Sequence, residues 1–287
     1  MAEQPHDAPH TTSTGVANSA ADWLDDHFEY ARPEYEAQLR AVGIQPGWRV
    51  LDAACGAGSF LPWIADLVGP SGNIAALDLT PENVAVVEQR VAGWSLPCSV
   101  ETKVGDVTAL PYPDDHFDAV WFANTSQYLG DDQLLATLAE FRRVVRPGGL
   151  VAVKDSTGPI PVHPLPPLLQ LRVLEAAGRA DDAIGGLVRI GTGRNPFLRR
   201  WLERAGLVAV WQRPTAIERW APFTPLERQM MIEGMGLFAM MAGRVDVSAE
   251  DRETWARLSD PNSPANLANH PEGYAHEGNI LAVGRVP

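Results

Sequence analysis

The chain has 287 residues, of which 45% are hydrophobic, and a formal net charge of −13 at pH 7. This length holds one α/β domain of ordinary size with an elaboration, and two complete nucleotide-binding domains would be cramped. The sequence contains no block of lysines and arginines. A nucleic-acid substrate or partner is therefore disfavoured, because contact with phosphates needs a basic face. The acidic composition is more compatible with a small neutral or cationic molecule as the substrate.

The N-terminal segment and the cysteines indicate the class of protein. No stretch approaches the apolar length that spans a membrane, so we expect no membrane association. The first twenty residues are polar and lack the basic and apolar regions of a signal peptide, so we expect a disordered tail and a cytoplasmic protein. Cys55 and Cys98 suggest neither a disulfide framework nor a metal cluster, and we expect no metal.

The first half of the chain alternates strands and helices. A helical rhythm of apolar residues, broken by Pro33, predicts two short helices between residues 22 and 39. Strands are then predicted at 49–55, 74–79, 100–104, 119–123 and 150–154, and helices at 59–68, from 81 onward, and at 131–145. This alternation predicts a parallel sheet with helices on both faces, and ligands outside the carboxyl ends of its strands.

The second half of the chain has a different distribution of prolines and glycines. Prolines and glycines between residues 159 and 193 indicate loops around an apolar helix. Further elements are predicted at 195–205 (helix), 207–211 (strand), 224–242 (a helix rich in methionine), 248–258 (helix) and 279–286 (strand). The methionine-rich helix is typical of a core, but soft methionine side chains also suit a pocket for an apolar substrate.

Residues 50–60 read as a buried strand that contains Asp52, turns through Gly56 and Gly58, and opens a helix. The glycines allow a tight turn and let a ligand approach bare amides. A carboxylate ahead of them favours a cationic ligand group, such as the ammonium of an amino acid, over a phosphate. The third glycine of a dinucleotide-binding turn is replaced by Leu61, which disfavours an NAD enzyme without removing it as an alternative.

This stretch resembles the first motif of class I S-adenosylmethionine (SAM)-dependent methyltransferases, V-L-D-x-x-C/S/T-G-x-G. The resemblance extends over roughly residues 45–155. It is nearest to the ubiquinone/menaquinone-type and secondary-metabolite branch, whose members act on small molecules. The resemblance implies a doubly wound, mostly parallel seven-stranded α/β sheet with a helical lid, and SAM as the cofactor.

The resemblance also implies roles for single residues. Asp78, which ends the second strand, accepts the ribose hydroxyls. Asp106 accepts from the exocyclic amine of adenine, Val107 packs beside the ring, and Asn124 faces the methionine part. Tyr30 lies in a segment that resembles the N-terminal helix that closes over the cofactor in small-molecule members, and an ordinary helix surface is the alternative. The cofactor contacts expected in full are Tyr30, Asp52, Ala53, Gly56, Gly58, Asp78, Leu79, Asp106, Val107, Asn124 and Gln127.

The catalytic base is less clearly indicated. Methyl transfer needs a nucleophile held in line with the sulfonium carbon and, where that atom bears a proton, a base. Some O-methyltransferases that resemble this sequence carry a histidine pair after the fourth strand, where Gln127 and Tyr128 stand here. Gln127 cannot act as a base, so a carbon or nitrogen acceptor, or a base elsewhere, is favoured. His163, in the proline-rich loop, is the candidate base, and a solvent-exposed loop histidine is the alternative.

We divide the chain into segments 1–20 (disordered tail), 21–45 (N-terminal helical cap), 46–158 (SAM-binding core), 159–195 (lid insertion), 196–219 (core helix and strand), 220–275 (helical substrate lid) and 276–287 (final core strand). We expect methyl transfer from SAM to a small, partly apolar molecule at carbon, nitrogen or oxygen, in secondary metabolism. A homodimer is allowed for. The alternatives are a non-methylating enzyme of this fold, an NAD(P)-dependent oxidoreductase and, less well supported, a macromolecular methyltransferase.

Overall fold

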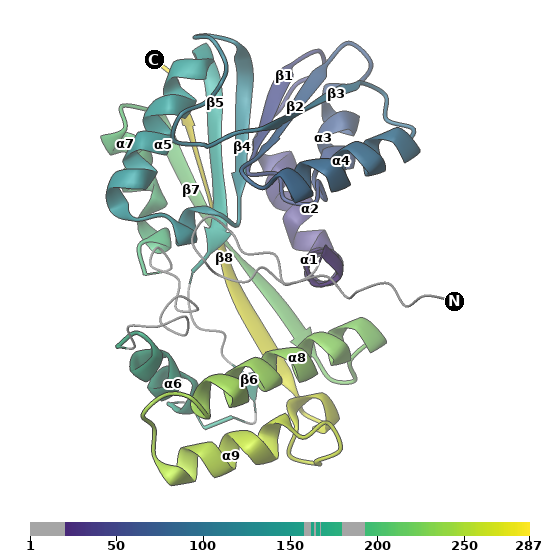
Figure 1. Cartoon of the computed structure of the whole chain (residues 1–287), viewed down its shortest axis with the longest axis vertical. Coiled ribbons are helices and arrows are strands. Elements are labelled where there is room, and N and C mark those ends of the chain that lie inside the picture. Colours follow the sequence, from purple (N-terminus) through teal and green to yellow (C-terminus); the bar gives the residue numbers. More distant parts are fainter. Residues whose placement is uncertain (1–20, 158–161, 164, 167, 180–192) are drawn as a thin grey trace.

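The computed structural model describes residues 21–157, 162–163, 165–166, 168–179 and 193–287. Within them, eight strands form one sheet (Figure 1). The strands are β1 Arg49–Ala53, β2 Asn73–Asp78, β3 Ser99–Val104, β4 Phe117–Ala123, β5 Val145–Ser156, β6 Val162–His163, β7 Val208–Trp220 and β8 Tyr274–Arg285. The α-helices are α1 Ala21–Tyr30, α2 Arg32–Ala41, α3 Leu61–Val68, α4 Pro81–Gly93, α5 Asp131–Val144, α6 Leu169–Ala177, α7 Leu198–Arg204, α8 Pro225–Ala242 and α9 Ala249–Ser259. The expected tail 1–20 and the glycines at 185, 186 and 191 lie outside the described residues.

The main sheet has the predicted doubly wound arrangement. Strands β1 to β5 pair in parallel in the order β3-β2-β1-β4-β5. β8 lies antiparallel beside β5, and β7 lies antiparallel along the other edge of β8. The seven-stranded, mostly parallel sheet is thereby confirmed. The strand order changes direction between β1 and β4, which is where open α/β sheets bind ligands.

Each face of the sheet carries its own apolar cluster, because successive strand residues point to opposite faces. Trp121 of β4 packs with the helices α1, α2 and α3, whereas its neighbour Phe122 packs with α5 and α7. The helix α5 shows why the periodicity predicted it. Its buried residues are Leu134, Thr137, Leu138, Phe141 and Val144, at helical spacing on one face.

A long antiparallel pair of strands, β7 and β8, carries a second lobe beyond the carboxyl ends of the parallel strands. β5 ends at Ser156, opposite Asn279, but β8 continues back to Tyr274 in pairing with β7. The helices α6, α8 and α9 gather around this extension (Figure 1). α8 packs against α9, α6 and α1, so the second lobe also meets the N-terminal cap.

Several elements differ from the prediction. β7 reaches residue 220 instead of 211, β8 begins at residue 274 instead of 279, and the two-residue strand β6, which was not predicted, pairs with Ala275 and Tyr274 of β8. α3 begins at Leu61 instead of Ser59, because the Leu61 amide donates to the Gly58 carbonyl and residues 59–60 still belong to the turn.

Candidate cofactor and acceptor site

The glycine turn after β1 is closed against the end of β2. The Cys55 amide donates to the Leu77 carbonyl at 3.0 Å, and the Gly56 amide donates to Asp78 Oδ2 at 2.9 Å. Both glycines have positive φ, +54° at Gly56 and +80° at Gly58. A Cβ at Gly58 would lie 2.8 Å from Leu61 Cδ1, whereas one at Gly56 would meet no described atom within 4 Å. Gly58 is therefore required by packing, and Gly56 faces space that a ligand can enter.

Asp52 lies in β1, directly before the glycine turn. Its side chain is 2% exposed, and its Oδ2 has no hydrogen-bond partner among the described residues. Burial, and then the neighbouring Asp78 carboxylate, raise the pKa of Asp52 well above its ordinary value. An unpaired buried carboxylate is costly, and a cationic group beside it would offset that cost. Asp52 thus fits the ammonium group of SAM. Ala53, the next residue, is fully buried.

Asp78 organises the end of β2. Its Oδ1 accepts from the Thr80 amide at 3.0 Å and from Asn83 Nδ2 at 3.1 Å, while its Oδ2 holds Gly56. The carboxylate is therefore oriented beside the glycine turn before any ligand arrives. Leu79, 39% exposed, adds apolar surface at the same edge. That Asp78 binds ribose hydroxyls stays a prediction that this placement supports.

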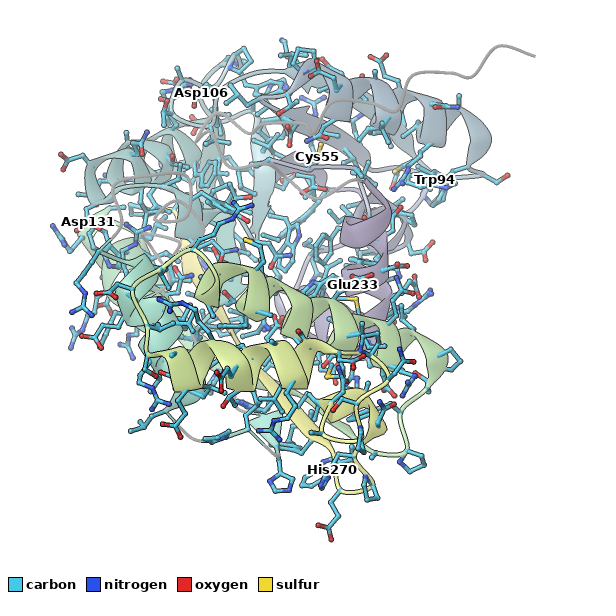
Figure 2. The ribbon with its side chains drawn as sticks, turned by 60° about the horizontal axis from the view of Figure 1, so that its bottom comes forward. Cys55, Trp94, Asp106, Asp131, Glu233 and His270 are labelled. Atoms are coloured by element: carbon cyan, nitrogen blue, oxygen red, sulfur yellow. The ribbon has the colours of Figure 1, made fainter. Side chains whose placement is uncertain are left out.

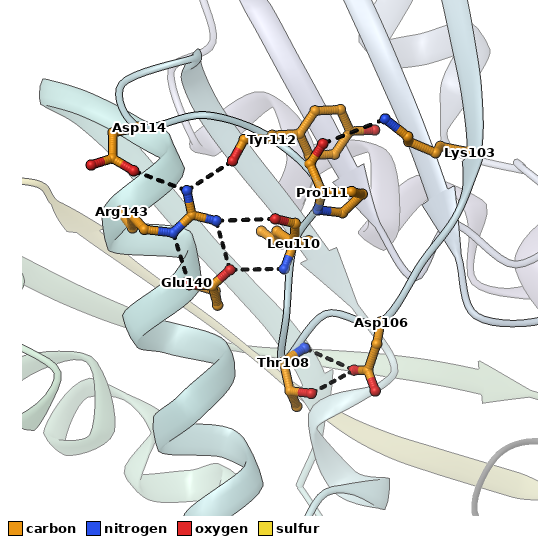
Figure 3. Close-up of polar contacts among 9 residues, drawn as sticks. All are labelled: Lys103, Asp106, Thr108, Leu110, Pro111, Tyr112, Asp114, Glu140 and Arg143. Atoms are coloured by element: carbon orange, nitrogen blue, oxygen red, sulfur yellow. Dashed lines mark hydrogen bonds and ion pairs between the residues drawn. The ribbon is translucent and has the colours of Figure 1, made fainter.

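The loop after β3 is fixed by α5 (Figure 3). Asp106 Oδ1 accepts from the amide and the hydroxyl of Thr108, both at 2.8 Å. Arg143 donates to the carbonyls of Leu110 and Tyr112 at 3.0 and 2.8 Å. Asp106 is exposed and Val107 is buried, which supports their predicted places at the polar edge and at the ring of adenine. Because α5 anchors this loop, we expect it to stay ordered without a ligand.

At the end of β4, the two residues predicted to contact the cofactor, Asn124 and Gln127, are placed differently. Asn124 adopts a left-handed φ of +56° and is partly exposed. Gln127 is buried, donates to the Asn124 carbonyl at 3.1 Å and accepts from Ser156 Oγ at 3.0 Å. Gln127 therefore braces the turn that presents Asn124, and a direct contact between Gln127 and a ligand stays a prediction without support from its position.

The N-terminal cap reaches the glycine turn through a residue that we did not predict. Asp25 of α1 forms a bidentate ion pair with Arg90, with distances of 3.0 and 2.5 Å, and accepts from Ser59 Oγ at 3.2 Å. Arg90 also donates to the Ala57 carbonyl at 3.1 Å. Tyr30 instead lies buried with its ring 4.8 Å from the Arg219 guanidinium carbon. Asp25 thus ties the cap to the cofactor turn.

The structure does not bring His163 to this site. His163 pairs with Tyr274, seven positions along β8 from Leu281, the partner of Lys154 (274 to 281). At about 3.3 Å per strand residue, that separation is roughly 20 Å. His163 is exposed, and its ring packs against His270 with 5.4 Å between centroids. Figure 2 shows His270 far across the molecule from Cys55 of the glycine turn. Its role as a base stays a prediction that this geometry disfavours.

The prediction missed a set of buried and half-buried polar residues where the cap meets β5 and β8. This set, the polar seam, comprises His27, Tyr35, Lys154, Glu277 and Asn279. His27 Nε2 lies 3.0 Å from Glu277 Oε2, and Asn279 Nδ2 donates to Glu277 Oε1 at 3.0 Å. Burial alone would raise the pKa of Glu277, but the charge and hydrogen bond of His27, with Lys154 nearby, lower it to about 2. The signal in the sequence was Lys154 itself, a charge within an apolar strand.

Two findings concern other kinds of site. Within the described residues, no group of three or more histidine, cysteine or acidic side chains could hold a metal ion. Likewise, no helix among those residues combines the length and the apolar character that crossing a membrane requires.

The comparisons with known proteins agree with the site geometry. A family model described as a methyltransferase domain matches residues 50–149. The demethylmenaquinone methyltransferase of Lactobacillus johnsonii is 31% identical over 153 residues, which are 47% of this chain and 62% of that protein. The 2-phytyl-1,4-naphtoquinone methyltransferase of Synechococcus elongatus is 31% identical over 115 residues, 40% of this chain and 48% of that protein. The chain thus spans less than two thirds of the length of either relative.

A solved structure extends the likeness of the fold. A Bacillus halodurans protein described as a methyltransferase superposes with a TM-score of 0.55 at 17% identity, covering 89% of this chain and 99% of that one. At this identity the match shows the fold alone. The family match instead covers the stretch that contains Asp52, both glycines of the turn, Asp78 and Asp106. Residues 50–149 of the chain therefore match a methyltransferase domain.

Proposed function

We propose that this protein transfers a methyl group from SAM to a small, partly apolar organic molecule of the hydroxylated quinone or aromatic type. The observation that carries the proposal is the buried carboxylate of Asp52, whose Oδ2 has no hydrogen-bond partner among the described residues, beside a glycine turn that faces open space. The quinone-type relatives match less than half of the chain, so the acceptor class is inferred from them together with the second lobe.

The second lobe supports an apolar acceptor. It stands beyond the carboxyl ends of β4 and β5, where the acceptor of a class I enzyme must approach. The helix α8 contributes buried Met230, Met231, Met235 and Met241 to the same apolar cluster that contains α1 and α2. Methionine side chains adapt to irregular apolar shapes. The lobe is thus suited to close over an apolar ring, as a lid does.

The residues of the chain have separate tasks in this reaction. Asp52 and Asp78 would hold the cofactor at its ammonium and ribose groups, and the loop from Asp106 to Tyr112 would hold the adenine. When bound, SAM supplies a methyl group that its positive sulfur has already activated. The methyl–sulfur bond breaks as the bond to the acceptor forms, and the proton of the acceptor leaves to solvent or to a base. The protein therefore acts mainly by orienting the acceptor and excluding water.

Finer points belong to the same proposal. A cytoplasmic location is supported by Cys55 and Cys98, which are both free thiols. A role in secondary metabolism rests on the resemblance alone. A homodimer also stays a proposal. The acidic net charge of −13 supports a small-molecule acceptor over a nucleic acid.

The substitution Asp52→Asn tests the proposal, because it removes the charge and keeps the shape. We expect unfolding stability to hold or rise, since the charged form is costly in the free protein. Affinity for S-adenosylhomocysteine, measured by calorimetry, should fall by 1.5–3 kcal/mol, roughly 10- to 150-fold, the usual range for a hydrogen bond to a charged group. Affinity for 5′-methylthioadenosine, which lacks the amino-acid part, should not change.

The alternatives give different outcomes. Equal losses of both ligands would remove Asp52 from the ammonium site. Tight binding of NAD, with no binding of S-adenosylhomocysteine, would favour an oxidoreductase. Incubation with SAM and a panel of hydroquinones and naphthols, followed by mass spectrometry, should show a product heavier by one methyl group. SAM binding with an isomerised or otherwise unmethylated product would favour a non-methylating enzyme of this fold.

A further inference from the structure

The chain contains only two lysines, Lys103 and Lys154, and its other basic side chains apart from histidine are arginines. Lys103 is partly exposed on β3, whereas Lys154, near the end of β5, is 0% exposed. A buried ammonium costs several kcal/mol unless partners offset the loss of water. A lysine kept at such a position calls for a reason beyond solubility or surface charge.

Lys154 donates to the side chain of Asn124. Its Nζ lies 2.5 Å from Asn124 Oδ1 and 3.4 Å from the centre of the Tyr35 ring, which covers it from α2. The remaining charged neighbours are Glu277 on β8, with His27 of α1 bound to it, and Asp155 on β5. Asp155 is already occupied by Ser126 Oγ and two backbone amides. Asn124 is therefore the direct polar contact of the Lys154 amine among the described residues.

This contact decides which end of the Asn124 amide a ligand meets. An asparagine side chain has one accepting oxygen and one donating NH₂ group, on opposite sides of the amide. The Lys154 amine donates the hydrogen bond, and the amide oxygen is the part of Asn124 that can accept it, so Oδ1 faces Lys154. The NH₂ group is then left for the partly exposed side, next to the end of β1 that holds Asp52.

We propose that Lys154 is a positioning residue that makes Asn124 a hydrogen-bond donor for an anionic ligand oxygen, which we assign to the ionised hydroxyl of the acceptor, a phenolate or enolate. This inference rests on the proposed function for the class of acceptor. Asn124 alone would touch the ligand, and Lys154 acts through it and through its charge. The carboxylate of the cofactor is the competing source of an anionic oxygen.

The polar seam makes this arrangement responsive to the ligand. Burial lowers the pKa of Lys154 from 10.5 to about 7, although Glu277 and Asp155 act in the opposite direction. An anionic oxygen at Asn124 would raise the pKa of Lys154 again, and Lys154 would lower the pKa of the acceptor hydroxyl in return, because the coupling is reciprocal. Lys154 thereby favours the ionised, more nucleophilic acceptor.

The first test uses 4-nitro-1-naphthol, whose phenolate absorbs at longer wavelength than its neutral form. The probe is titrated into the full chain in the presence of S-adenosylhomocysteine, about one pH unit below the pKa of the free probe. We expect saturable binding with most of the bound probe ionised, a shift of its pKa by about one unit or more. Lys154→Met and Asn124→Ala should abolish the shift, Lys154→Arg should keep much of it, and Lys103→Met is the matched control that should not alter it.

The second test needs no substitution in the core. Lysine labelled with ¹³C at Cε gives two side-chain signals, which Lys103→Met assigns. We expect the Lys154 signal in the free protein to titrate near neutral pH, and addition of the nitronaphthol at pH 8 to move it toward the protonated position. This measurement decides the question if Lys154→Met does not fold, as checked by circular dichroism.

Three results would overturn the inference. One is a bound probe whose ionised fraction equals that in buffer, and another is the absence of saturable binding. The third is a loss of affinity for S-adenosylhomocysteine but not for 5′-methylthioadenosine in Lys154→Met, with the probe shift retained, which would assign the oxygen to the cofactor carboxylate. Methylation of a quinol without the probe shift would leave the proposed function standing and refute this inference. A Lys154-dependent shift without any methylation would do the reverse.

Discussion

Alanine substitution of the two glycines in the turn after β1 should have different effects, mainly on stability at Gly58 and mainly on ligand affinity at Gly56. At Gly58 the added methyl would lie 2.8 Å from Leu61 Cδ1 and 3.1 Å from Val87 Cγ2, and the backbone has φ of +80°. Leu61 and Val87 are fully buried, so neither can move aside freely. Left-handed strain costs about 1–2 kcal/mol and overpacking about 1–3 kcal/mol. Gly58→Ala should therefore lower the free energy of unfolding by about 2–5 kcal/mol.

At Gly56 the strain term remains, since φ is +54°, but the methyl meets no described atom within 4 Å. Gly56→Ala should cost only about 1–2 kcal/mol of stability. Its methyl would instead occupy the space next to the bare amide, so affinity for S-adenosylhomocysteine should fall by more than about tenfold, or 1.4 kcal/mol. Urea unfolding and calorimetry measure the two effects. Equal stabilities of the two variants, or full ligand affinity in Gly56→Ala, would refute the reasoning.

Three further predictions concern the cap, the buried lysine and the adenine loop. Asp25→Ala removes the ion pair with Arg90, so the amides of α1 should exchange hydrogen faster while those of β1 do not. Lys154 has its pKa lowered from 10.5 to about 7, so its contribution to stability is fully present above pH 10.5 and lost as pH falls through 7. The free energy of unfolding should therefore rise between pH 7 and 10.5, with a limiting slope of about 1.4 kcal/mol per pH unit. Lys154→Met should flatten this rise, as measured by urea unfolding across the same pH range. Arg143→Gln should destabilise the chain by about 1–3 kcal/mol, measured in urea, because two loop carbonyls lose their donor.

The parallel half of the fold could be predicted because its signals are local. Apolar runs of strand length, glycines at the turn and carboxylates at strand ends all act within a few residues. The positions of Asp52, Gly56 and Gly58 follow from one strand and one turn. Their approach to Asp78 follows from the rule that parallel neighbours end at the same edge. The Gly56–Asp78 hydrogen bond is the direct result.

The pair of strands β7 and β8 was harder to predict because its signals are mixed. β7 was predicted to end at residue 211, yet it continues to 220 through Pro214 and several charged residues. Within the described sheet, β7 pairs only with β8, so one side of its backbone has no strand partner. A proline is tolerated on such an edge because its missing donor breaks no ladder bond on that side. The pattern that usually marks a turn is here an edge strand, and the end of this strand was predicted too early as a result.

The polar seam could not be predicted from the sequence, because its members meet only after the cap docks. His27 and Glu277 are 250 positions apart, and neither lies in a motif. Their contact joins α1 to β8, and Tyr35 of the same cap covers Lys154. The cap is thus bonded to the glycine turn region through Asp25 and to the polar seam through His27. Because one rigid element makes both contacts, displacing the cap must disturb the glycine turn and Lys154 together. With Lys154 acting on the acceptor as proposed, this coupling would make cofactor binding and acceptor orientation depend on each other without a direct contact between the residues that perform them.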